Sequence, residues 1–145
     1  MAMNKPKPSR EAAYIEANEG RTTLPYRDTV GKLTIGVGFN LTDVGLYDEE
    51  IDFILANRIE RMKLILPNKI ATWEALSSDQ RLCLMDMYYN LGWPRLAKFK
   101  RMLKHIDDGK YDQAAEELLK SKYASQVGLR AVRNAELLKK KLERV

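Results

Sequence analysis

The sequence predicts an α+β fold that is mostly helical, with a small β-hairpin near the amino terminus. Apolar residues alternate on both sides of a Val30-Gly31 turn, as they do in a two-stranded hairpin. After Asp48 they recur at helical spacing in one segment after another. A chain of 145 residues with 45% hydrophobic and 31% charged residues has the size and composition of one soluble globular domain, which can be divided into two lobes.

The first element is a short helix that carries an acid at its end. Ser9 is a favourable N-cap for a helix that runs through Asn18, and Gly20 supplies a stop of the left-handed kind. Glu19 therefore lies at the C-terminal end of the helix, where partial negative charge gathers. A carboxylate is disfavoured there, which suits an acid that must hold a proton near neutral pH.

The hairpin that follows brings polar side chains to its turn. Asp28 comes just before the turn and Thr34 just after it, so we expect both side chains to lie near each other and to face the helix end with Glu19. One acid on a helix end and one carboxylate on a strand end form the pair that glycoside hydrolysis requires. Gly36 and Gly38 indicate a close approach of the backbone just beyond.

Five further helices are predicted from apolar spacing and end signals, at residues 48–66, 78–91, 99–106, 111–121 and 129–144. Pro67 is the expected stop of the first of them. The helix that follows the Ser77 capping box has almost no polar face and is expected to be central to the core. It contains Cys83, the only cysteine, which we expect to be buried rather than nucleophilic.

The pattern Glu-Gly…Tyr-x-Asp-Thr-x-Gly-x-x-Thr-Ile-Gly-x-Gly runs from Glu19 to Gly38, with Asp28 nine residues after Glu19 and Thr34 six residues further. It resembles the phage-type lysozymes, which are the T-even phage lysozyme and its endolysin relatives in glycoside hydrolase family 24. The resemblance extends from about Ser9 to about Asn134, and in the central helix it includes Arg81, Cys83, Met87, Asn90 and Gly92.

This resemblance implies a single lysozyme-like domain made of two lobes. A flexible tail at residues 1–8 is followed by an active-site lobe at 9–47, a connecting helix at 48–66 and a helical lobe at 67–145. Carried over by position, Glu19 is the general acid, Asp28 is the carboxylate that holds the attacking water, and Thr34 is the hydroxyl that helps to place it.

The resemblance also implies substrate-binding residues in both lobes. Arg130 takes the place of an arginine that pairs with the catalytic glutamate, and Gln126 falls near the path of the glycan. Asn40, Tyr89 and Asn90 fall at substrate-facing positions.

The implied activity is that of a muramidase, an inverting hydrolase of the β-1,4 bond between N-acetylmuramic acid and N-acetylglucosamine in peptidoglycan. It needs no cofactor and no metal. Because the amino terminus has charge but no apolar core behind it, no signal peptide is predicted. The expected protein is a monomeric phage endolysin that stays in the host cytoplasm until a holin releases it to the periplasm for host cell lysis. A virion-borne lysin or a bacteriocin would use the same domain.

The distribution of charge leaves two other functions open. Residues 95–145 carry 14 Lys/Arg and 7 Asp/Glu, a balance of +7, whereas residues 1–94 have a balance of −2. A basic half favours an anionic partner, so a binding module for nucleic acid or membrane surfaces is one alternative, with steep salt dependence as its sign. Because the chain has no helix-turn-helix or aromatic-stacking motif, we do not expect nucleic-acid binding. Because its longest uncharged run, Leu33 to Thr42, is far too short to span a bilayer, we expect no stable membrane insertion. A catalytically inactive wall-binding homologue is the other alternative, and the intact Glu19, Asp28 and Thr34 argue against it.

Overall fold

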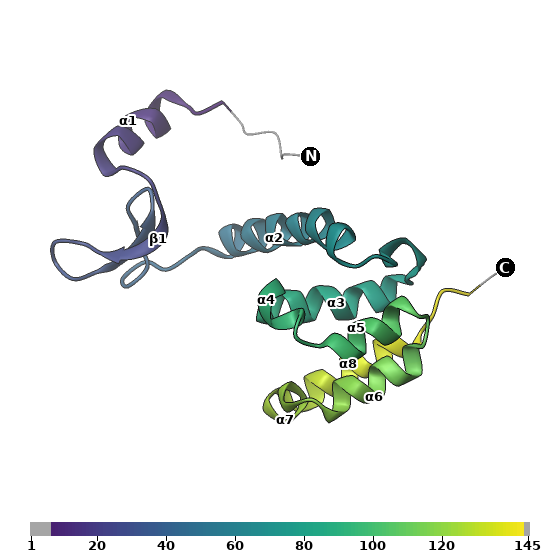
Figure 1. Ribbon diagram of the computed structural model, residues 1–145. Helices are drawn as coiled ribbons and strands as arrows, with labels where there is room; N and C mark the ends of the chain where they lie inside the picture. Colours follow the sequence, from purple (N-terminus) through teal and green to yellow (C-terminus); the bar gives the residue numbers. More distant parts are fainter. Residues whose placement is uncertain (1–6, 144–145) are drawn as a thin grey trace. The chain divides into compact units, whose positions relative to one another are not determined.

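The computed structural model describes residues 7–143, and the chain divides into two compact units (Figure 1). The first unit ends at Ala56 and the second begins at Asn57, so the boundary lies within the long helix α2 (Asp48–Lys69). Most of the predicted tail at residues 1–8 lies outside the described residues.

Helix α1 (Arg10–Glu19) has the two ends that the sequence predicts. The Ser9 hydroxyl accepts a hydrogen bond from the Ala12 N–H at 3.1 Å, which satisfies one of the free donors of the first turn. At the other end, Gly20 has a φ of +77° and its N–H donates to the Glu16 carbonyl at 2.7 Å. Glu19 is therefore the last residue of the helix.

The predicted hairpin is confirmed, and a third strand extends it to an antiparallel sheet in the order β1 (Thr22–Arg27), β2 (Leu33–Gly36), β3 (Phe39–Asn40). In the register of this sheet, Thr34 lies opposite Tyr26 on one side and opposite Asn40 on the other. Thr34 therefore lies on the central strand, and the residue is only 4% exposed.

Helix α2 ends at Lys69 rather than at Leu66, with Pro67 inside its last turn. A proline removes its own N–H from the helix but not those of its neighbours. The Ile70 N–H still donates to the Leu66 carbonyl at 2.9 Å, so the chain stays helical past the proline.

The second unit contains the four predicted helices α3 (Ser78–Leu91), α5 (Lys100–Asp107), α6 (Tyr111–Lys120) and α8 (Leu129–Lys139). Three short elements were not predicted: the 3₁₀ helix η1 (Trp73–Ala75), α4 (Trp93–Leu96) and α7 (Lys122–Val127). The predicted end of the last helix at residue 144 is wrong for residues 140–143, and Arg144 itself lies outside the described residues. The chain leaves the helix where the Lys140 carbonyl accepts a hydrogen bond from the Ser77 hydroxyl.

Helix α3 is at the centre of the core of the second unit, against the α5, α6 and α8 group (Figure 1). Cys83, Leu84 and Met87 on this helix are fully buried, which confirms the predicted burial of the cysteine. Burial raises the pKa of the Cys83 thiol well above its usual range. The apolar residues Leu82 and Tyr89 of the same helix are about half exposed, so its apolar surface extends beyond the face that packs in the core.

Among the described residues, no helix combines the length and the hydropathy that crossing a membrane requires.

Candidate active site

The turn between β1 and β2 is closed by hydrogen bonds that Asp28 and Lys32 exchange. The Asp28 N–H donates to the Lys32 carbonyl at 2.9 Å. In return, Oδ1 of Asp28 accepts from the N–H groups of Lys32 at 2.8 Å and Val30 at 3.0 Å. One carboxylate oxygen of Asp28 therefore fixes the side chain to the turn, while Oδ2 has no donor among residues 7–143.

The Thr34 hydroxyl belongs to the same hydrogen-bonded group. Its Oγ1 donates to the Lys32 carbonyl at 2.9 Å, and this carbonyl also accepts from the Asp28 N–H. The two residues thus share Lys32 as a partner, which agrees with the expectation that they lie near each other. A hydroxyl has a single hydrogen, so the Thr34 oxygen can offer only its lone pairs to another group.

Glu19 lies against the backbone that joins β2 to β3. A Cβ atom added to Gly38 would lie 2.5 Å from Oε2 of Glu19 and 2.8 Å from its Cδ, which is closer than atoms can approach. Gly38 also has a φ of +63°, which side-chain-bearing residues rarely adopt. The predicted close approach is therefore real at Gly38, and the group that approaches is the Glu19 carboxyl.

The loop after β3 holds Asn40 by its side-chain amide. Oδ1 of Asn40 accepts from the Asp43 N–H at 2.9 Å, and its Nδ2 donates to Oδ2 of Asp43 at 3.2 Å. Asp43 also pairs with the Lys32 ammonium at 3.1 Å, and hydrogen bonds from Lys32 and Asn40 lower the pKa of this carboxyl. Asn40 lies next to Thr34 in the sheet, and its contact with substrate stays a prediction.

In the second unit, Arg130 has a partner that the sequence analysis missed. Its Nε and Nη2 donate to the two carboxylate oxygens of Asp86 at 2.8 Å each, and the Asn134 amide donates to Oδ2 of Asp86 at 2.9 Å. The hydrogen bond from Arg130 holds the pKa of Asp86 below its ordinary value, although partial burial opposes this effect. The sequence did contain a signal for this partner, since Asp86 is the one acid between Leu82 and Leu91 in an otherwise mostly apolar stretch. The implied pairing of Arg130 with Glu19 concerns residues of different units and stays a prediction.

A sequence profile of the family described as Phage lysozyme matches residues 16–136. The chain belongs to the phage lysozyme family. A curated protein from Dictyostelium discoideum, "Probable T4-type lysozyme 2", is 26% identical to it over 148 residues, which cover 82% of this chain and 87% of that protein. As a member of the phage lysozyme family, the protein is a lysozyme-type peptidoglycan hydrolase and hence a glycoside hydrolase, and its α+β fold agrees with this assignment.

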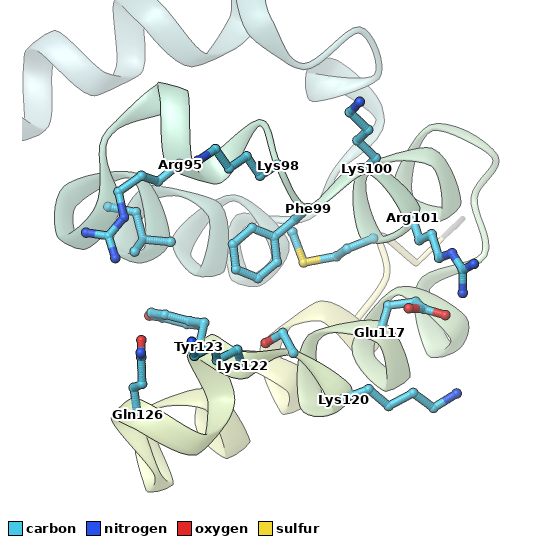
Figure 2. A pocket seen from close by; sticks show the side chains of 13 residues that line it. Arg95, Lys98, Phe99, Lys100, Arg101, Glu117, Lys120, Lys122, Tyr123 and Gln126 are labelled. Atoms are coloured by element: carbon cyan, nitrogen blue, oxygen red, sulfur yellow. The ribbon is translucent and has the colours of Figure 1, made fainter.

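The other substrate-binding residues implied by the phage lysozyme resemblance lie on two helices of the second unit. Tyr89 and Asn90 are exposed on α3, where Tyr89 lines a groove of about 320 Å³ together with Arg58 and Arg61. Gln126 is exposed on α7 and lines a larger pocket of about 620 Å³ (Figure 2). Their contacts with a glycan stay predictions.

Within residues 7–143, the phage lysozyme chain contains no group of three or more His, Cys, Asp or Glu side chains that could hold a metal ion.

Proposed function

We propose that this phage lysozyme is a muramidase that cleaves the β-1,4 bond between N-acetylmuramic acid and N-acetylglucosamine with inversion at the anomeric carbon. Glu19 is the general acid, Asp28 is the general base, and Thr34 helps to place the water. One observation supports this proposal most directly: the Glu19 carboxyl is seated against Gly38, in the same unit as the turn that fixes Asp28 and Thr34.

The acid step follows from the position of Glu19. It is the last residue of α1, and its carboxyl lies against the backbone at Gly38. Its proton is transferred to the glycosidic oxygen as the bond from this oxygen to the anomeric carbon breaks. The absence of a side chain at Gly38 leaves the space that the Glu19 carboxyl occupies.

The water step uses the oxygen atoms that the turn leaves free. A water molecule can donate one hydrogen to Oδ2 of Asp28 and the other to Oγ1 of Thr34, whose own hydrogen is committed to the Lys32 carbonyl. The lone pair of the water is then directed away from both residues. It forms the new bond to the anomeric carbon while Asp28 takes the proton that the water loses.

In its biological setting, we propose a monomeric endolysin that stays in the host cytoplasm until a holin releases it and that acts on the wall in the periplasm during host cell lysis. Membership of the phage lysozyme family supports this role. Its test is an expression experiment in bacteria: lysis should require a co-expressed holin. Lysis without a holin would contradict this route of release.

The enzymatic proposal is tested by clearing of permeabilised Gram-negative cells and by analysis of the sugar ends that are released. New reducing ends should be N-acetylmuramic acid. Glu19→Gln should lower the rate at least about a hundredfold because it keeps the shape but removes the proton donor. Glu16→Gln on the same helix is the matched control, since Glu16 pairs with Arg21 on the surface. Clearing at the normal rate by a folded Glu19→Gln protein would refute the assignment.

A further inference from the structure

The pocket of about 620 Å³ that Gln126 lines lies within the second unit. Most of its lining residues form two walls, one from the α4–α5 segment and one from the α6–α7 segment. Figure 2 shows Arg95, Lys98, Lys100 and Arg101 on the α4–α5 side, and Lys122 and Gln126 among the residues of the α6–α7 side. A concave pocket of this size suits a small-molecule ligand.

The rim of this pocket is strongly basic. The lining residues include six cations and a single acid, Glu117: the cations are Arg95, Lys98, Lys100, Arg101, Lys120 and Lys122. None of the six forms a salt bridge with any of the residues that the structure describes. Because they line one pocket and lack acidic partners, their charges add to a positive potential there, which favours an anionic ligand.

The floor of the pocket has a different character. Phe99 and Tyr123 meet edge to face, with ring centroids 5.8 Å apart and an angle of 86° between the rings. Met102 and Leu91 complete this apolar surface. A ligand that fits both the floor and the rim has an uncharged, ring-shaped body with anionic groups at its periphery.

We propose that this pocket binds a phosphorylated sugar of the bacterial envelope. The guanidinium groups of Arg95 and Arg101 match the oxygen atoms of a phosphate, and the aromatic floor suits a sugar ring. Because the cations come from both walls, they can contact phosphates on opposite ends of one molecule. The envelope as the source of this sugar rests on the proposed function, whereas the preference for phosphate rests on the pocket alone. Binding there would hold the enzyme at the envelope while it cleaves the glycan.

The test is a calorimetric titration of the full chain with a glucosamine disaccharide that carries a phosphate at each end. We expect salt-dependent binding that the dephosphorylated disaccharide does not show. The double variant Arg95→Gln/Lys122→Gln removes one cation from each wall and should weaken binding at least about tenfold. Lys139→Gln/Lys140→Gln removes the same charge at the end of α8, outside the pocket lining, and should change binding less than about twofold.

Three results would overturn the proposal. Equal weakening by both double variants would mean that net charge, not the pocket, attracts the ligand. Equal binding of a short polyglutamate peptide would assign the pocket to carboxylates. Tighter binding of a single-stranded oligonucleotide would assign it to nucleic acid. Because titration needs no hydrolysis, Glu19→Gln protein should bind the disaccharide normally. Failure of the muramidase proposal can therefore be distinguished from failure of the proposed binding of a phosphorylated sugar.

Discussion

Asp86 holds the guanidinium of Arg130 with both of its carboxylate oxygens, at 2.8 Å each, and so joins α3 to α8 in the second unit. The same carboxylate accepts from the amide of Asn134, whose side chain is almost completely buried. A two-pronged contact of this kind is stronger and more directional than a single ion pair. It makes Asp86 the common partner of two residues on the last helix.

Asp86→Ala should lower the free energy of unfolding by about 2 kcal/mol, because it leaves the buried Asn134 amide without an acceptor. The contribution of the ion pair itself is small, since both side chains are about a third exposed. Urea denaturation measures the difference. Asp108→Ala is the matched control: it breaks a pair with Lys104 at 2.9 Å on the surface and should leave stability unchanged. Equal effects of the two substitutions would contradict the role of Asp86.

The contribution of Asp86 should depend on pH in one direction. Its pKa in the folded protein is lowered from the ordinary value of 3.8, chiefly by the hydrogen bond from Arg130. A lowered pKa means stability that is present above pH 3.8 and is lost as the pH falls through the folded value. The stability difference between wild type and Asp86→Ala should therefore be constant between about pH 7 and pH 5 and should narrow in more acidic solution. A difference that stays constant would assign the effect to packing.

Gly38→Ala should lower the rate of peptidoglycan hydrolysis more than about tenfold, because the new methyl group would displace the Glu19 carboxyl. Gly45→Ala is the matched control. Gly45 has a similar φ of +69° and nothing within 4 Å of the added carbon, so both variants should lose about 1 kcal/mol of stability from backbone strain. Turnover assays and thermal melting of the two proteins make the comparison. Equal activities would show that Glu19 is not constrained by Gly38.

Two substitutions at Asp28 should separate its roles in the turn and in catalysis. In Asp28→Asn the amide oxygen can still accept from the N–H groups of Val30 and Lys32, so this variant should keep the melting temperature but lose at least about a hundredfold in rate. Asp28→Ala should lose the same activity and also about 1–2 kcal/mol of stability, because the two hydrogen bonds that the Asp28 side chain accepts in the turn disappear. An active Asp28→Asn protein would exclude Asp28 as the general base.

The stereochemistry of the product tests how Asp28 acts. If Asp28 holds a water molecule together with Thr34, the two carboxyl groups are separated by about 6.5–9.5 Å and the β-linked glycan first releases the α-anomer. Proton NMR of fresh product, recorded before mutarotation, identifies the anomer. An initial β-anomer, or a glycosyl ester trapped on Asp28, would replace inversion by double displacement while leaving the muramidase assignment intact.

The elements that were predicted correctly are those whose ends are marked by local chemistry. Ser9 and Gly20 delimit α1, and the capping box of Ser77 with Gln80 begins α3. The missed elements are short: β3 has two residues, too few for an alternating pattern, and α7 has six. Helix α4 has only four residues, too few for helical apolar spacing, and its one local sign is Pro94 in its first turn, a position where proline favours a new helix.

In the candidate site too, residues that a local pattern marks could be predicted, whereas contacts between distant residues could not. Glu19, Asp28 and Thr34 could be singled out because they fall at a recognisable spacing along a short stretch, and their catalytic roles stay predictions. Glycine at position 38 predicted that something approaches closely, but only the folded chain identifies that group as Glu19. Asp86 was missed because its partners lie 44 and 48 residues away, a separation that no local pattern encodes.

Because Cys83 is completely buried, the reactivity of its thiol reports how often the core of the second unit opens. Disulfide-exchange reagents react with the thiolate, and the folded core both excludes the reagent and disfavours this charged form. Modification therefore requires that α3 separate from the helices around it. The rate of thiol labelling at low denaturant would then measure how often the core of the second unit opens, under conditions in which nearly all molecules are folded and with no introduced label.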